Sequence, residues 1–185
     1  MKCPKCKDSA LHAKQMDEQF AAQECERCGG DWILVEDFVQ WRENNPGFEF
    51  AKNVDVEEDE ILDSQNALLC PRTGTFMRKF RIAAQNAHRL DYSAAVGGIW
   101  LDNGEWELLK KEGIAGQLNE ILTNKWQQAV RESMSKEQFA LIYSRKFGET
   151  DYQKVRDIRG WIDSHPAKAD LRAYLFAEDP YSAER

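Results

Sequence analysis

Two stretches of the sequence share one pattern: RCGGDWILVEDFVQW at residues 27–41 and AVGGIWLDNGEWELL at residues 95–109. Each reads Gly-Gly-x-Trp and continues into an acidic helix start. The first stretch follows a pair of cysteines, whereas the second follows Ser93 and Val96. The chain therefore carries an internal repeat whose second copy keeps the turn but lacks the cysteines.

The first copy belongs to a C-x2-C-x18-C-x2-C pattern, formed by Cys3, Cys6, Cys25 and Cys28. Four thiolates with this spacing close a tetrahedron around zinc and leave no position open for a substrate. A redox dithiol pair normally accompanies a βαβ pattern, which is missing here, and a rubredoxin-type iron site stays as the minor alternative. We therefore predict one structural Zn²⁺ per chain, held by these four cysteines.

Residues 1–45 are predicted to form a zinc ribbon followed by a helix. The spacer between the cysteine pairs suits a β-hairpin with strands at 10–16 and 19–24. Gly29 and Gly30 follow the last cysteine, where the backbone approaches the sulfurs and a positive φ is expected. The helix places Phe38 and Trp41 on one face and should end by Asn45, before Pro46.

Residues 67–112 are predicted to form a degenerate, metal-free ribbon plus helix. The alignment places Cys70 on Cys3, Thr73 on Cys6, and Ser93 and Val96 on the second cysteine pair. Strands are expected at 74–82 and 87–94, and a helix at 103–113. The retained turn should let its Trp pack between hairpin and helix, with Val96 and Phe76 replacing the metal by apolar packing.

A substitute metal site from Cys70, His88 and Asp91 has ligand types that zinc accepts. However, the odd spacing of His88 and Asp91 on a strand points them to opposite faces. We therefore expect a single zinc site.

The rest of the sequence divides into a linker and a helical region. Residues 46–66 hold six acidic residues between Asp55 and Asp63, a composition that favours a solvated connector over a docking segment for a basic partner. A short strand is expected around Phe48 and Phe50. Apolar residues at helical spacing predict four helices in the 113–185 domain, at 114–134, 135–148, 150–165 and 166–179, which should pack against the second ribbon.

The predicted fold class is α+β: two small zinc-ribbon-like hairpin and helix units, the second metal-free, followed by a C-terminal helical bundle. The basic residues of the tail are interleaved with acidic ones, which favours a solvated amphipathic face over a helix-turn-helix with Arg156 and Arg159 on a basic surface. An exposed Trp161 would instead indicate a partner surface.

The motif CPKC…CERCGGDW followed by a helix resembles the TFIIB-type zinc-ribbon (zf-TFIIB) family. The resemblance covers residues 1–45 well and 68–112 partially, through Gly97, Gly98, Trp100, Leu101 and Asp102. It implies zinc binding by the four cysteines, and the missing ligands put metal binding by the second copy in doubt. The transcription label is an analogy of the fold, because ribbons host many functions.

The sequence shows no P-loop, nucleophile elbow or H-E-x-x-H motif, so we expect no enzyme and no small-molecule substrate. The net charge of −7 disfavours broad nucleic-acid binding. We expect a non-catalytic, cytoplasmic protein-interaction or regulatory module with a protein partner and no membrane association. The alternatives are a transcription-associated nucleic-acid-binding protein, using Lys5, Lys7 and Arg27, and a zinc or redox sensor.

Overall fold

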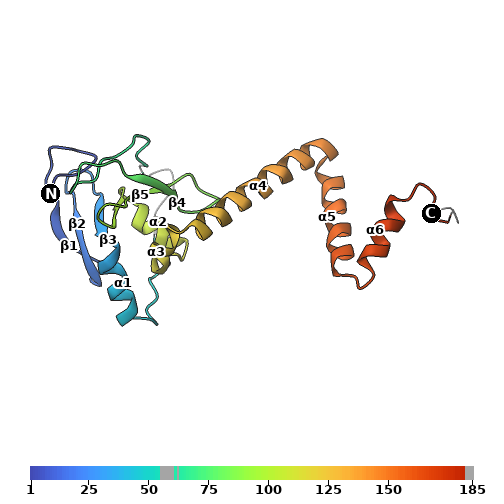
Figure 1. Ribbon diagram of the computed structural model, residues 1–185, viewed down its shortest axis with the longest axis horizontal. Helices are drawn as coiled ribbons and strands as arrows, with labels where there is room; N and C mark the ends of the chain where they lie inside the picture. The colour runs from blue at the N-terminus through green and yellow to red at the C-terminus, as the bar shows by residue number, and fades with distance from the viewer. Residues whose placement is uncertain (55–60, 62, 182–185) are drawn as a thin grey trace. The chain divides into compact units, whose positions relative to one another are not determined.

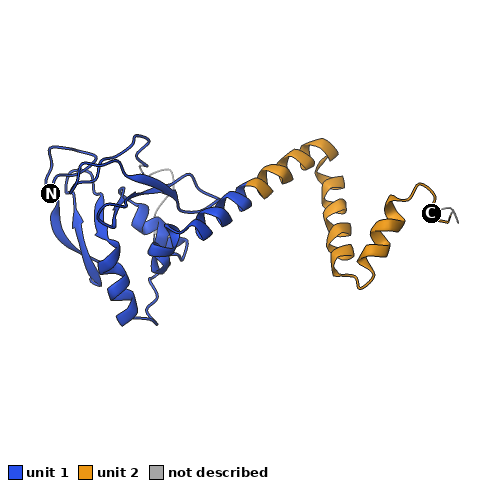
Figure 2. Cartoon of the chain, in the orientation of Figure 1, with its two compact units in different colours: residues 1–134 blue, residues 135–185 orange. Residues whose placement is uncertain are grey.

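The computed structural model describes residues 1–54, 61 and 63–181. Its contacts separate two compact units, Met1–Met134 and Ser135–Arg185 (Figure 2). The domain boundaries at 45, 66 and 112 were proposed from sequence patterns, and they stay a prediction. The acidic run at Asp55–Glu60, with its connector or docking role, lies outside the described residues.

In the first unit, six strands form one antiparallel sheet (Figure 1). The strands are β1 (His12–Met16), β2 (Phe20–Glu24), β3 (Asp31–Leu34), β4 (Arg78–Arg81), β5 (Arg89–Ser93) and β6 (Gly98–Leu101). Their spatial order is β1-β2-β3-β6-β5-β4. Each predicted hairpin is present, and the two ribbons meet at a pairing between β3 and β6 that the sequence analysis did not anticipate.

The central pairing of β3 and β6 has the register of a local two-fold axis. Trp32 lies opposite Trp100, which holds the same place in the repeat. Asp31 pairs with Leu101, and Ile33 pairs with Ile99. The pairing of β3 with β6 is therefore symmetric with respect to the repeat, and it joins the two hairpins into one sheet.

The helices pack on one face of this sheet. They are α1 (Val35–Asn44), α2 (Glu105–Lys111), the 3₁₀ turn η2 (Ala115–Gln117), α3 (Leu118–Ile121) and the start of α4 (Asn124–Phe147). Ile33, Ile99 and Phe38 are fully buried in the core beneath them. Trp106 packs edge-on against Phe20 and donates a hydrogen bond to Asp17, so this indole joins the first hairpin to the second helix.

Trp32 and Trp100 lie in a second buried cluster with Cys3, Cys25 and Cys70. The prediction that the Trp of each repeat packs between hairpin and helix is therefore wrong. Side chains alternate across a strand, so the flanking Ile33 and Ile99 face the helices while the indoles face the cysteine loops.

Phe48 and Phe50 do not form a strand, contrary to the sequence prediction. Their rings pack against Trp41, and the ring of Phe50 also packs against Trp106. This aromatic cluster contributes apolar burial that a lone strand at the sheet edge would not provide.

Helix boundaries beyond residue 113 differ from the predicted ones. The expected 114–134 helix is interrupted after α3, and Thr123 Oγ1 accepts a hydrogen bond from the Trp126 amide at the start of α4. Helix α4 then runs across residues 134 and 135, where one helix was expected to end and the next to begin, because no Gly or Pro interrupts this stretch before Gly148. Packing against the second ribbon is present at Trp126, whose indole donates to Ile82 O, and at Gln127, which bonds the Arg81 backbone.

The second unit contains the rest of α4, α5 (Glu149–Ser164) and α6 (Lys168–Phe176). Helix α5 begins one residue before the predicted start at 150, and α6 ends at Phe176, three residues before the predicted end at 179. Ile162 is the one buried residue among residues 135–181. The predicted α+β class, with an N-terminal ribbon region and a helical C-terminal region, is confirmed, and the helices of the second unit leave most of their apolar side chains exposed.

Candidate metal centre

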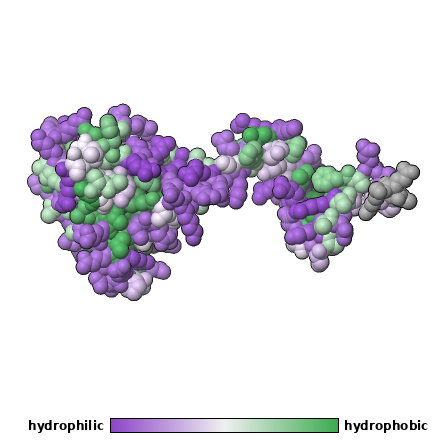
Figure 3. Space-filling view, in the orientation of Figure 1, coloured by the Kyte–Doolittle hydropathy of each residue, from purple (hydrophilic) through white to green (hydrophobic). Residues whose placement is uncertain are grey.

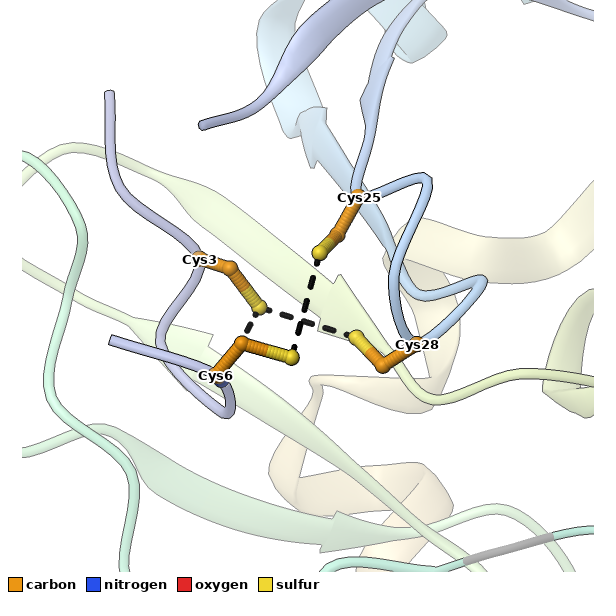
Figure 4. Close-up of side chains that lie close together, drawn as sticks. All are labelled: Cys3, Cys6, Cys25 and Cys28. Atoms are coloured by element: carbon orange, nitrogen blue, oxygen red, sulfur yellow. Dashed lines mark hydrogen bonds between the residues drawn. The ribbon is translucent and has the colours of Figure 1, made fainter. Parts of the chain in front are cut away.

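Four cysteine side chains from two loops point toward one another (Figure 4). Cys3 and Cys6 lie in the loop before β1, and Cys25 and Cys28 lie between β2 and β3. The Cys3 and Cys28 sulfurs are 3.6 Å apart, and those of Cys6 and Cys25 are 4.0 Å apart. All four sulfurs lie within 4.8 Å of one another. The hairpin thus brings the two cysteine pairs to one point, as the sequence predicted.

These distances match the chemistry of a tetrathiolate zinc centre. A Zn–S bond of about 2.3 Å in a tetrahedron implies sulfurs about 3.8 Å apart, whereas a disulfide requires about 2.05 Å. The five cysteines are free thiols. Four protein ligands would fill the coordination of Zn²⁺, so the centre suits a structural ion without an open position for a substrate.

The backbone of both loops is shaped to wrap an ion. The Cys6 amide donates to Cys3 Sγ at 3.2 Å, and the Gly29 amide donates to Cys25 O at 2.8 Å. Lys7 and Gly29 occupy the left-handed region, with φ of 65° and 68°. A Cβ on Gly29 would also lie 2.6 Å from Asn103 Oδ1, so both conformation and space favour glycine there.

Burial and hydrogen bonds set the thiol pKa values apart. Burial raises the pKa of Cys3 to about 11. For Cys25 burial acts in the same direction, but contact with Ser9 Oγ at 3.4 Å and with backbone amides lowers the pKa to about 6. Cys25 is therefore the thiol that loses its proton most easily. Metal binding would displace protons from Cys3 and from Cys28, because burial also raises the pKa of Cys28.

The metal loop is tied to the second ribbon by a partly buried ion pair. Lys5 Nζ lies 3.0 Å from Asp102 Oδ1, and the side chain of Asp102 is 1% exposed. The same oxygen accepts a hydrogen bond from the Trp100 indole at 3.1 Å. Arg27 instead pairs with Asp8 at the surface. Lys5 and Arg27, two of the positive charges near the cysteines in the sequence, are thus engaged by carboxylates.

The second ribbon keeps the two turns of the first. Gly74 and Gly97 have φ of 69° and 63°, at the places of Lys7 and Gly29. The bridge between Leu69 and Phe76 repeats the one between Lys2 and Ala10. The backbone shape is therefore retained where three of the four sulfur positions hold other side chains.

The four sulfur positions of the first ribbon correspond to Cys70, Thr73, Ser93 and Val96 in the second ribbon. Cys70 and Ser93 are 2% and 1% exposed. Although burial opposes it, hydrogen bonding with Ser93 and Thr73 lowers the pKa of the Cys70 thiol. Val96 packs against this cluster as expected, but Phe76 is 76% exposed, so its predicted role in replacing the metal is wrong.

Cys70, His88 and Asp91 do not converge on one point. Asp91 forms an ion pair with Lys79 at 2.8 Å. Within residues 1–54, 61 and 63–181, the metal-compatible clusters are the four cysteines and a group of carboxylates, Asp63, Asp102 and Glu105. This grouping gives no support to a substitute zinc site at Cys70.

Sequence reasoning missed this carboxylate group. Burial raises the pKa of Glu105 well above its ordinary value, and repulsion from Asp102 and Asp63 acts in the same direction. Glu105 accepts a hydrogen bond from the Asp102 amide at 2.8 Å, as in a capping box. The three-residue spacing of Asp102 and Glu105 could have indicated that these two side chains lie close together. The position of Asp63 beside them depends on tertiary packing.

Comparison with known families matches residues 2–44 to a family model described as a transcription factor zinc-finger, of the TFIIB zinc-ribbon type. This segment is similar to TFIIB-type zinc ribbons, and the match together with the sulfur cluster supports one Zn²⁺ site. The match does not extend to residues 67–112, so assigning the second copy to the family stays a prediction.

Comparison with curated proteins gave no match, and comparison with solved structures gave none. Among the residues that the structure describes, no helix has the length and apolar character needed to cross a membrane.

Proposed function

We propose that this chain is a non-catalytic, cytoplasmic protein-interaction or regulatory module built on a structural four-cysteine zinc ribbon. The observation that carries the proposal is the apolar surface of residues 135–181, where many large side chains are exposed (Figure 3). They include Phe139, Leu141, Ile142, Tyr143, Phe147, Val155, Ile158, Trp161, Leu175 and Phe176. Exposed apolar patches of this kind mark interaction surfaces in soluble proteins.

The geometry of the metal centre supports a structural role. Its four sulfurs complete a tetrahedral coordination set, which leaves no position on Zn²⁺ to activate water or polarise a substrate. The sulfurs come from loops that begin and end the first hairpin, so the ion would hold these loops together. A binding scaffold needs this rigidity, whereas a zinc hydrolase would need an open site.

A protein partner is favoured over nucleic acid by the charge distribution in the second unit. Lys154 pairs with Asp151, and Arg172 pairs with Asp163. The whole chain carries a net charge of −7. Because nucleic-acid binding draws much of its free energy from phosphate neutralisation, a partly neutralised helical surface on an acidic chain is poorly suited to it.

Two alternatives have specific support. The family description favours a transcription-associated nucleic-acid-binding protein, although Lys5 and Arg27 are engaged by Asp102 and Asp8. A zinc or redox sensor would use the low thiol pKa of Cys25, but the burial of Cys3 and Cys25, at 1% and 0% exposed, restricts access of an oxidant.

Affinity capture with the tagged full-length chain, from a nuclease-treated lysate, tests the proposal. We expect a protein in stoichiometric amount, and its recovery should fall when Ile158→Gln and Trp161→Gln are introduced together. Lys146→Gln, at an exposed polar position of the same unit, is the matched control. Recovery of nucleic acid alone from an untreated lysate, or equal capture by both variants, would contradict the proposal.

A further inference from the structure

A cavity of about 690 Å³ opens between the metal loop and the segment at residues 64–76 of the second ribbon. Its walls include Cys3 and Pro4 on one side and Leu68, Leu69 and Cys70 on the other. We call it the lysine groove, since Lys2, Lys5 and Lys7 line it. The volume suits a few side chains of a peptide or a comparable ligand.

The lysine groove is a basic site on an acidic protein. Among the residues that the structure describes, its lining includes three lysines and no carboxylate. Lys5 is paired with Asp102, but Lys2 and Lys7 are exposed and have no ion pair with the part of the chain that the structure describes. Two positive charges are therefore available to a ligand, in a chain whose net charge is −7.

Apolar side chains lie at the same groove. Phe76 is 76% exposed and Leu69 is 43% exposed, although they sit on a bridge beside the buried Leu68 and Cys70. Exposure of a phenylalanine on an ordered bridge leaves apolar area in water, which a bound side chain would remove.

We propose that the lysine groove binds an acidic peptide segment of a partner protein, with an apolar residue packed on Phe76 and Leu69. Carboxylates of the segment pair with Lys2 and Lys7. This inference rests on the proposed function and names the chemistry of the partner.

A peptide suits the lysine groove better than nucleic acid does. The part of the chain that the structure describes contributes no arginine to the groove for bidentate phosphate contacts. Two lysines without ion pairs neutralise about two phosphates, which is a small electrostatic gain. The surrounding negative charge repels a long polyanion more than a short segment with a few carboxylates. The Pro, Leu and Phe side chains in the walls offer apolar contact to a peptide anchor.

Fluorescence anisotropy on the zinc-loaded full-length chain tests the inference. The probes are fluorescein-labelled peptides with acidic runs flanking Leu, Phe or Trp, together with a basic peptide of matched length and a single-stranded DNA. We expect salt-sensitive binding of acidic peptides and none of the basic one. Lys2→Glu combined with Lys7→Glu should weaken this binding at least about tenfold, as should Phe76→Ala.

The matched charge control is Lys125→Glu combined with Lys146→Glu, since both lysines are exposed and lie outside the groove. It should change peptide affinity less than about twofold. Zinc content of one ion per chain in every variant shows that the ribbon is intact. Absence of acidic-peptide binding, equal loss in the control, or preferential DNA binding through Lys2 and Lys7 would overturn the inference.

Lysate capture separates this inference from the proposed function. One outcome is that the chain captures a protein, that the Lys2 and Lys7 substitutions do not change its recovery, and that no acidic peptide binds. This outcome would refute peptide binding at the lysine groove and leave the proposed interaction module supported. Acidic-peptide binding at the groove, with no protein captured through the second unit, supports the groove and counts against the surface on which the proposed function rests.

Discussion

Cys3 and Cys70 occupy matching positions in the two ribbons, and both are buried, at 1% and 2% exposed. Only Cys3 has three sulfurs around it. Its pKa is raised, whereas that of Cys70 is lowered by its bonds to Ser93 and Thr73 despite burial. The same residue type is thus a candidate ligand in one ribbon and a buried free thiol in the other.

Serine substitution at this pair separates the two roles. Cys3→Ser should weaken zinc binding by more than about 100-fold, because losing a ligand costs more than the 10–100-fold seen for outer-shell changes. Cys70→Ser should leave one zinc per chain. The measurement is zinc content by mass spectrometry after dialysis against a chelator. Two zinc ions in the wild type, falling to one in Cys70→Ser, would contradict the metal-free second ribbon.

Asp91 provides a pH-dependent test. Burial raises its pKa from 3.8 to about 6, although Lys79 acts in the opposite direction. The folded state therefore binds this proton more tightly than the unfolded state, so the contribution of Asp91 to stability decreases as pH rises through 6. The free energy of unfolding of the wild type, minus that of Asp91→Asn, should decrease by about 1 kcal/mol from pH 5 to pH 8. Urea unfolding of the zinc-loaded proteins measures it; a difference that is constant with pH would refute the shift.

At the scale of elements, the Gly-Gly-x-Trp motif serves the pairing of β3 with β6. A Cβ on Gly30 would lie 2.2 Å from Cζ2 of Trp100, and a Cβ on Gly98 would lie 1.9 Å from Cζ2 of Trp32. The second glycine of each ribbon therefore makes room for the indole of the other. This reciprocal contact explains why the second copy keeps its turn without the cysteines.

Alanine substitution tests the reciprocal contact. Gly30→Ala should lower the free energy of unfolding by at least about 1–3 kcal/mol, because the methyl group overlaps a buried ring. Adding Trp100→Phe should recover part of the loss, since phenylalanine lacks the Cζ2 region of the indole. Gly47→Ala, with nothing within 4 Å of the added Cβ, is the control. Chemical unfolding gives the double-mutant coupling; additive effects would exclude the contact.

The elements also show how far local patterns reach. Both hairpins and both acidic helix starts were predicted, because strand alternation, glycine turns and capping residues act over a few positions. The stop predicted at Ser135 was wrong, since a capping pattern does not end a helix when good helix formers continue on both sides. Tertiary contacts set the start of α4 instead, where Trp126 and Gln127 bond the backbone of β4 and its flanking residue Ile82.

At the scale of the molecule, the continuous sheet should transmit the loss of zinc from one ribbon to the other. The bond between Lys5 and Asp102 and the β3–β6 ladder join the metal loops to the second ribbon. Removing zinc with a chelator should therefore increase amide exchange in β6 as well as in β1–β3. Hydrogen exchange with mass spectrometry on the full chain measures this.

Peptides from residues 149–164 provide the internal control, because they lie in the second compact unit. Their exchange should stay the same within error. Unchanged protection of β6 after zinc removal would show that the second ribbon is stable without the first, contrary to the coupling expected from the shared sheet.

The sequence by itself determined the metal ligands, the repeat, the hairpins and the helical character of the tail. These features depend on short spacings: a C-x2-C turn brings two sulfurs together whatever the rest of the chain does. Tertiary structure alone decided that β3 pairs with β6, that Trp32 and Trp100 face the cysteine loops, and that Lys5 meets Asp102 beside the lysine groove. The β3–β6 pairing and the contact between Lys5 and Asp102 join residues more than sixty positions apart in the chain, and an internal repeat in the sequence does not show which surfaces of its two copies pair.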